Sequence, residues 1–252
     1  MKISAELIKS LMKAIRQQER MDGALKWAPN RSLFMSLIED NEYYFAAKLK
    51  NQDLKKVNYY ENKILTEGKN NKYYDLIEEA KNKSQHRELN QLFIDELKSN
   101  VTHDEFDFSI TEDLGETAID HLINAAHIYR FCYINFPNAN VKNEFSMTVT
   151  NAYLEKNNIG NFTLLLSEVI NSNIVYFNSS IMDENQFVVM FLKLMAGQIK
   201  KNVERIEKTQ EVYEKNSIKL NKYGVNIQNY ITGNVVFTIS DFASVNNISY
   251  NT

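Results

Sequence analysis

The residues best suited to chemistry lie in the Asn-rich stretch INFPNANVKNEF, residues 134 to 145. Pro137 is one of only two prolines in the chain, and it falls between an apolar stretch and a second helical pattern. A loop that opens a helix presents unpaired backbone N–H groups and the positive end of the helix dipole, and both favour an anion. Polar loops between helices also often carry binding functions. The pattern therefore predicts an anion-binding loop that leads into a helix beginning near Asn143.

Two buried helices are expected to position this loop. From Ala118 to Ile134 apolar residues cover nearly the whole helical circumference, which is typical of a central buried helix. The helix after the loop should run over residues 143–157 and stop near Asn158 and Gly160. With only seven glycines and two prolines, the chain favours long helices over a many-stranded sheet. We therefore predict a mainly α-helical fold.

The N-terminal part of the chain has a helical period as well. An apolar stripe predicts an amphipathic helix over residues 3–20, and Gly23 and Pro29 mark an irregular connection after it. A second helix should start at Ser32, which is a suitable N-cap residue. These two helices would precede the buried pair.

The middle and the later part of the chain add further elements. Residues 51–100 show helical spacing, and the alternation FDFSI within residues 101–117 suits a short strand or hairpin. A long, charged helix follows the buried pair, and its apolar seam packs either on the same chain, which we favour, or on a partner. The seam repeats every seven residues at Leu192, Ile199, Ile206, Tyr213 and Leu220.

The last residues have the pattern of a helix-turn-helix that has just begun. Ser240 can cap a short helix, Asn246 and Asn247 can form a turn, and Ser249 can cap a second helix. The sequence given ends before a second helix could be complete, so DNA binding requires a more complete module than this chain shows.

Composition and motifs exclude several classes of protein. The net charge of −3 gives no general attraction to nucleic acid or anionic membranes. The four histidines form no zinc pattern, and the sequence has no dinucleotide fingerprint, Walker loop or nucleophile elbow. Cys132 is the only cysteine and is expected to be an inert core thiol. No stretch has the length of a membrane span or a signal peptide, so we expect a cytoplasmic protein.

Three short patches, in a fixed order, resemble the Fic-domain proteins. In AAHIYRFCYINFPNANVK an apolar helix runs into a loop, as in the family, where the loop reads His-Pro-Phe, two variable positions, then Gly-Asn-Gly-Arg. The stretch SLIED, residues 36 to 40, resembles the Ser-x-Ile-Glu-Gly segment of the Fic inhibitory helix. The end, FTISDFASVNNISYNT, resembles the start of the winged-helix module that follows many Fic domains.

The resemblance implies a role for each position of the loop 135–143. Allowing one deletion, Asn135 takes the place of the histidine and Phe136 that of the phenylalanine. Pro137 and Asn138 fill the two positions that follow, the second of which is acidic in the family. Asn138 would there accept a Mg²⁺ or its water more weakly than a carboxylate. The Gly-Asn-Gly-Arg places are taken by Ala139, Asn140, Val141 and Lys142. Asn140 and Lys142 would then hold the phosphates of ATP.

The family transfers AMP from ATP to a hydroxyl of a target protein, and that reaction needs a base to take the hydroxyl proton. Asn135 has no titratable group near neutral pH, and losing a general base typically costs about 10²–10⁴-fold in rate. We expect activity to be lost or strongly weakened, with ATP and Mg²⁺ as cofactors only if some remains. His127 lies roughly 12 Å up the helix and should be a hydrogen-bonded core residue instead of a substitute base.

The resemblance also implies a domain plan. Residues 1–30 would be a helical extension, 31–225 a Fic-like helical domain with a β-hairpin flap at 103–116, and 226–252 the start of a winged helix. Within an inhibitory helix over about 32–48, Ser36 and Glu39 would block the pocket, with Glu39 pairing with Lys142. Read without the resemblance, Glu39 belongs to a solvated helical turn, and 103–116 is an ordinary polar loop.

Two other functions stay open at this point. One is a non-catalytic helical regulatory or interaction protein that acts through its C-terminal helix-turn-helix and its heptad helix, as a homo-oligomer or on another partner. The other is a Doc-like phosphotransferase, suggested by Ala139 and Asn140, although the missing base counts against that activity too. The target protein and the preferred nucleotide are not encoded in any motif of the sequence.

Overall fold

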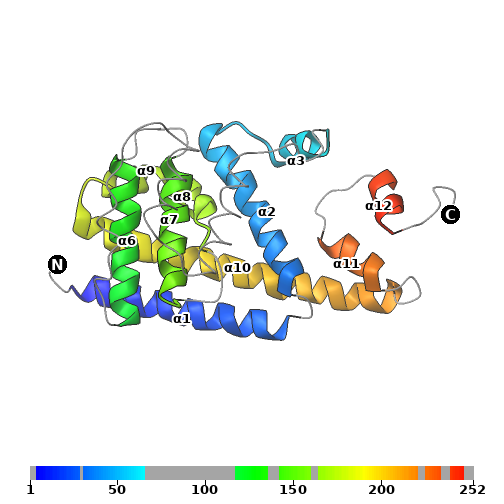
Figure 1. The fold of residues 1–252 in the computed structure, drawn as a ribbon, viewed down its shortest axis with the longest axis horizontal. Helices are drawn as coiled ribbons and strands as arrows, with labels where there is room; N and C mark the ends of the chain where they lie inside the picture. The colour runs from blue at the N-terminus through cyan, green and yellow to red at the C-terminus, as the bar shows by residue number, and fades with distance from the viewer. Residues whose placement is uncertain are drawn as a thin grey trace. The chain divides into compact units, whose positions relative to one another are not determined.

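The computed structural model describes residues 4–28, 31–65, 117–135, 142–159, 164–220, 225–233 and 239–246. Every regular element in these ranges is an α-helix, which confirms the predicted mainly helical fold (Figure 1). The predicted hairpin at 103–116 and the helical patterns within 66–100 lie outside the described residues.

The chain divides into two compact units, each made of segments that are far apart in the sequence. The first unit comprises residues 1–19 and 70–199, and the second comprises residues 20–69 and 200–252. Helices α1 (Ala5–Trp27) and α10 (Glu184–Leu220) contribute to both units. The first unit also contains α6 (Ala118–Asn135), α7 (Lys142–Lys156), α8 (Ser167–Ser172) and α9 (Ile174–Ser180), and the second contains α2 (Arg31–Lys50), α3 (Lys56–Leu65), α11 (Val225–Gly233) and α12 (Ile239–Val245).

Helices α6 and α7 lie side by side in the first unit (Figure 1). The prediction that α6 is a central buried helix holds between His121 and Tyr133, where every residue is buried or half-buried, whereas Ile119 and Ile134 near its two ends are each 46% exposed. Its fully buried side chains lie on one face, and the side chains between them are half-buried. The buried residues of α6 are Leu122, Ala125, Ala126, Ile128, Tyr129 and Cys132.

Cys132 and the end of α7 behave as the sequence predicts. The Cys132 thiol is fully buried, and burial raises its pKa, so it stays protonated and belongs to the core.

After α7 the backbone of Asn158 turns left-handed, with φ of 55°. The Ile159 N–H then donates to the Leu154 carbonyl at 2.8 Å, which is the pattern of a Schellman stop.

Helix α1 is longer than its sequence pattern predicts. It continues through Gly23 to Trp27, so the expected break at Gly23 is wrong. A glycine inside a helix costs only about 1 kcal/mol relative to alanine. Met21 and Leu25, on either side of it, are buried in the second unit, and their burial outweighs that cost. Helix α2 begins at Arg31, so Ser32 is its second residue and not its cap.

The long helix α10 buries the first three residues of its heptad seam within the chain, Tyr213 is half-buried, and the side chain of Leu220 lies outside the described part. Leu192, Ile199 and Ile206 are at most 1% exposed. Farther along, the Tyr213 hydroxyl donates to Asn229 Oδ1 of α11 at 3.2 Å, and Gln228 Nε2 donates to the Tyr213 carbonyl at 3.1 Å. These contacts confirm the favoured interpretation, in which the seam packs on the same chain.

The C-terminal helices α11 and α12 form a small pair in the second unit. The rings of Tyr230 and Phe242 meet edge to face with centroids 5.6 Å apart. Helix α12 begins at Ile239, so Ser240 lies inside the helix and is not its cap. A turn follows at Asn246, as expected, and Asn246 Nδ2 donates to the Phe242 carbonyl at 2.9 Å. The second helix predicted from Ser249 lies outside the described residues.

Candidate functional site

The two ends of the candidate loop are well defined in the structure. Asn135 is the last residue of α6, and Lys142 is the first residue of α7. The four candidates between them lie outside the described residues: Phe136, Asn138, Ala139 and Asn140. The structure therefore confirms that one helix ends at Asn135, that a second begins close to the predicted Asn143, and that the two helices pack together.

Asn135 is exposed and its side chain turns back onto its own helix. The Nδ2 group donates to the Phe131 carbonyl at 2.8 Å, which satisfies one of the free carbonyls at the end of α6. An amide has no proton to exchange near neutral pH, so this residue cannot act as a general base. Its observed role is that of a helix-end residue.

Lys142 lies at the start of α7 with its charge held over an aromatic ring. Its Nζ atom is 4.1 Å from the centre of the Tyr133 ring on α6. Such a cation–π contact contributes about 0.5–1 kcal/mol at an exposed site. The Lys142 carbonyl accepts a hydrogen bond from Ser146 Oγ at 2.6 Å. The ammonium is thus held at the first turn of α7, over a ring of α6.

Asn143, the second residue of α7, is held by a polar chain that sequence reasoning missed. The hydroxyl of the fully buried Tyr129 donates to Asn143 Oδ1, and Asn143 Nδ2 donates to Ser167 Oγ of α8 at 3.4 Å. One signal could have revealed it, because a buried tyrosine hydroxyl requires a hydrogen-bond partner. Tyr129 lies within a strongly apolar stretch, and the nearest Asn-rich segment in the sequence is the loop that follows it.

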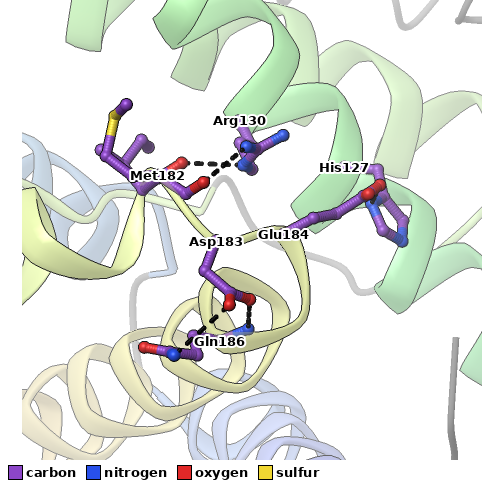
Figure 2. Close-up of polar contacts among 7 residues, drawn as sticks. His127, Arg130, Met182, Asp183, Glu184 and Gln186 are labelled. Atoms are coloured by element: carbon purple, nitrogen blue, oxygen red, sulfur yellow. Dashed lines mark hydrogen bonds and ion pairs between the residues drawn. The ribbon is translucent and has the colours of Figure 1, made fainter.

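Helix α6 also holds the turn before α10, as Figure 2 shows. Arg130 Nε donates to the Ile181 carbonyl at 2.8 Å, and a second guanidinium nitrogen donates to the Met182 carbonyl at 3.4 Å. Asp183 Oδ1 accepts from the Gln186 backbone N–H at 2.9 Å and caps α10. The turn before α10 is therefore held by its own residue Asp183 and by Arg130 of α6.

His127 takes part in the same contact and is confirmed as a hydrogen-bonded residue, although it is half-buried and not a full core residue. Its Nδ1 atom lies 2.9 Å from Glu184 Oε1 (Figure 2). Burial lowers the pKa of His127, the Glu184 carboxylate raises it, and the Arg130 guanidinium lowers it, with a net pKa below the ordinary value. His127 is engaged at the start of α10, away from the end of α6 that carries Asn135.

The expected inhibitory residues lie in the second unit. Ser36 and Glu39 are both in α2, and the Glu39 side chain is partly exposed. Lys142 belongs to the first unit, so the expected Glu39–Lys142 ion pair stays a prediction.

The described residues contain no group of three or more His, Cys, Asp or Glu side chains arranged to hold a metal ion. Within the same ranges, no helix combines the length and the apolar character needed to cross a bilayer. Asn138, the predicted Mg²⁺ ligand, lies outside them.

Comparison with models of known protein families and with curated protein sequences gave no match. The case for a function therefore depends on the residues of this chain alone.

Proposed function

We propose that this protein is a divergent Fic-like protein that binds a nucleotide by its phosphates at the loop 135–143 and has little or no AMP-transfer activity. One observation carries the proposal: α6, which ends at Asn135, packs on the 15-residue helix α7, and Lys142 is the first residue of α7. The start of a helix attracts anions through its free N–H groups and its dipole.

Each end of the loop supports a different half of this proposal. Lys142 supplies a positive charge that the Tyr133 ring holds at the start of α7. This charge and the helix dipole act in the same direction on a phosphate. Asn135 replaces the base, so a target hydroxyl would keep its proton and transfer would be slowed by about 10²–10⁴-fold. The expected behaviour is binding of ATP or ADP with Mg²⁺, without efficient transfer.

The remaining parts of the Fic resemblance belong to the same proposal. They are the β-hairpin flap at 103–116, the winged-helix start at 226–252, the inhibitory action of Ser36 and Glu39, and a protein target in the cytoplasm. They rest on the short sequence patches alone, because the family comparison gave no match.

The test is ATP and ADP binding with Mg²⁺, measured by calorimetry on the full chain. We expect binding by the wild type and at least a tenfold weaker affinity for Lys142→Ala, because the variant loses the charge beside the phosphates. Lys200→Ala is the matched control, since Lys200 forms only an exposed pair with Glu204 at 3.6 Å and should not change the affinity. A transfer assay with labelled ATP should show little product for the wild type and more for Asn135→His.

Two results would overturn the proposal. If the wild type binds neither nucleotide, the loop is structural, and the non-catalytic interaction protein becomes the better interpretation. On that interpretation a partner, including a second copy of the chain, would bind the exposed side of α10, where Val212 is 46% and Ile218 is 84% exposed. If Lys142→Ala and Lys200→Ala bind equally well, the nucleotide binds elsewhere.

A further inference from the structure

One side of α6 carries a row of exposed and half-buried residues, here called the α6 stripe. At 100° a residue its five members fall within about 80° of the helix circumference, and they extend roughly 22 Å along the axis. They are Ile119, Ile123, His127, Arg130 and Ile134. Ile119 and Ile134 are each 46% exposed. The α6 stripe is therefore apolar toward both ends and polar in the middle.

The turn before α10 lies against the polar middle of the α6 stripe (Figure 2). Arg130 donates to the Met182 carbonyl at 3.4 Å, and His127 lies 2.9 Å from Glu184. The Met182 side chain is 78% exposed, and the Glu184 side chain is 61% exposed. Met182 thus adds a fourth apolar side chain to the three isoleucines of the stripe. Apolar side chains gathered on one surface gain free energy when a partner covers them, and such surfaces mark sites of association.

The polar middle of this surface carries both signs of charge and has hydrogen-bonding groups to spare. Arg130 uses Nε and one terminal nitrogen for the carbonyls of the turn, so its other terminal nitrogen has no acceptor within the described part of the chain. Glu184 uses Oε1 for His127, and its Oε2 atom accepts no bond from the described residues. A partner that fits must therefore offer an acceptor to Arg130, a donor to Glu184 and apolar groups around them.

We propose that a second copy of this chain covers this surface, so that the protein forms a two-fold symmetric dimer through the α6 stripe. A second copy offers what the surface requires, because a two-fold axis places the patch against itself and lets Arg130 of each copy meet Glu184 of the other. With the axis through the middle of the stripe, the two α6 helices run antiparallel. The Ile119 end of one copy then covers the Ile134 end of the other.

The size of the contact sets the expected strength of the dimer. A contact one helix wide and roughly 22 Å long covers less than the roughly 800 Å² per partner of a standard interface. We therefore expect a reversible dimer with a dissociation constant on the order of 10 μM. Sedimentation equilibrium of the full chain from about 1 to about 200 μM covers both sides of that value.

Two variants and a matched control locate the interface. Met182→Asp and Ile134→Asp each place a charge against apolar groups of the other copy, so each should weaken the dimer at least tenfold. Val175→Asp is the control, because Val175 is 82% exposed on α9 but lies two residues before the buried Phe177, on the opposite side of that helix. It should dimerise like the wild type. Urea unfolding first checks that each variant folds.

Methyl NMR of the wild type tests the same surface without any substitution. The protein is labelled at the isoleucine, methionine and valine methyl groups and diluted through the expected dissociation constant. The methyl resonances of Ile119, Ile134 and Met182 should shift with concentration, and that of Val175 should not.

The inference is overturned if the wild type stays monomeric at about 200 μM. It is also overturned if Met182→Asp and Ile134→Asp dimerise as well as Val175→Asp does. Concentration-dependent methyl shifts at Val212 of α10, without shifts along the α6 stripe, would place the contact elsewhere and overturn it as well. No nucleotide is present in these measurements, so the dimer and the proposed nucleotide binding stand or fall separately.

Discussion

Two helix starts in the first unit, those of α7 and α10, are both held by α6, but by different chemistry. At α10 the contacts are charged: Asp183 caps the helix, Glu184 pairs with His127, and Arg130 holds the two preceding carbonyls. At α7 they are aromatic and amide groups: Tyr133 under Lys142, and Tyr129 bonded to Asn143.

The difference matters because a helix start favours one negative charge, and at α10 the chain supplies that charge itself. The Asp183 carboxylate lies where an external anion would otherwise bind. At α7 the first residue is instead Lys142, and its ammonium lies over the uncharged Tyr133 ring, 4.1 Å from the ring centre. The turn before α10 is thus held by ionised side chains, and the start of α7 by an aromatic ring and an amide. The following predictions test the structural side of this comparison.

The largest expected effect is that of Arg130→Leu. The guanidinium donates to the carbonyls of Ile181 and Met182, and the variant would leave both without this donor. Hydrogen bonds from charged donors contribute about 1.5–3 kcal/mol, so the free energy of unfolding should fall by about 2–3 kcal/mol in urea denaturation. Arg20→Leu is the control, because Arg20 pairs with Glu207 at 3.7 Å between exposed side chains and its loss should cost about 0.5 kcal/mol. Equal losses for the two variants would show that the Arg130 contacts do not stabilise the turn.

A smaller effect is expected for Asp183→Ala. The variant removes the acceptor for the Gln186 N–H at the first turn of α10. Loss of a capping side chain costs about 1 kcal/mol, to be read from the same urea denaturation. Asp183→Ser, which keeps a capping oxygen, should recover most of this free energy. If the alanine and serine variants are equally unstable, the contribution of Asp183 is not that of a cap.

The smallest effect is a pH dependence that depends on His127. The folded-state pKa of His127 lies below its unfolded value of about 6.5, so the unfolded chain takes up the proton first as the pH falls. The contribution of His127 to the free energy of unfolding should be constant above pH 6.5. It should decrease as the pH falls through 6.5 toward the folded-state pKa. Urea denaturation at pH 7.5 and pH 5.5 measures the decrease, which His127→Gln should reduce. A His127 NMR titration midpoint above 6.5 would contradict this sign.

Much of the helical framework follows from local pattern. The helix around Ala118–Asn135, the helix stop at Asn158 and the heptad seam from Leu192 to Ile206 all appear in the structure as predicted. Each depends on residues close together in the chain, where a stripe of apolar side chains or a left-handed Asn is sufficient. The start of a helix after the Asn-rich stretch was likewise predicted close to its observed position, Lys142.

Local pattern was insufficient wherever packing outweighed it. Gly23 suggests a break, but the burial of Met21 and Leu25 keeps α1 continuous. Ile119 and Ile134 are apolar, which suggests that they are buried, but each is 46% exposed. No local pattern shows which residues near the ends of α6 the other helices cover. In the candidate region, Asn135 and Lys142 could be named from sequence, whereas Tyr129 gave only a general signal, that a buried hydroxyl needs a partner, and Tyr133 gave none.

The mainly helical fold and the positions where α6 ends and α7 begins follow from the sequence, because they depend on neighbours within a few turns of chain. The contacts between side chains at these two helix ends depend on the tertiary structure. Tyr129 reaches Asn143, and Arg130, its neighbour on α6, reaches the turn before α10. Adjacent residues of a helix point in directions about 100° apart, so their partners depend on how the helices pack.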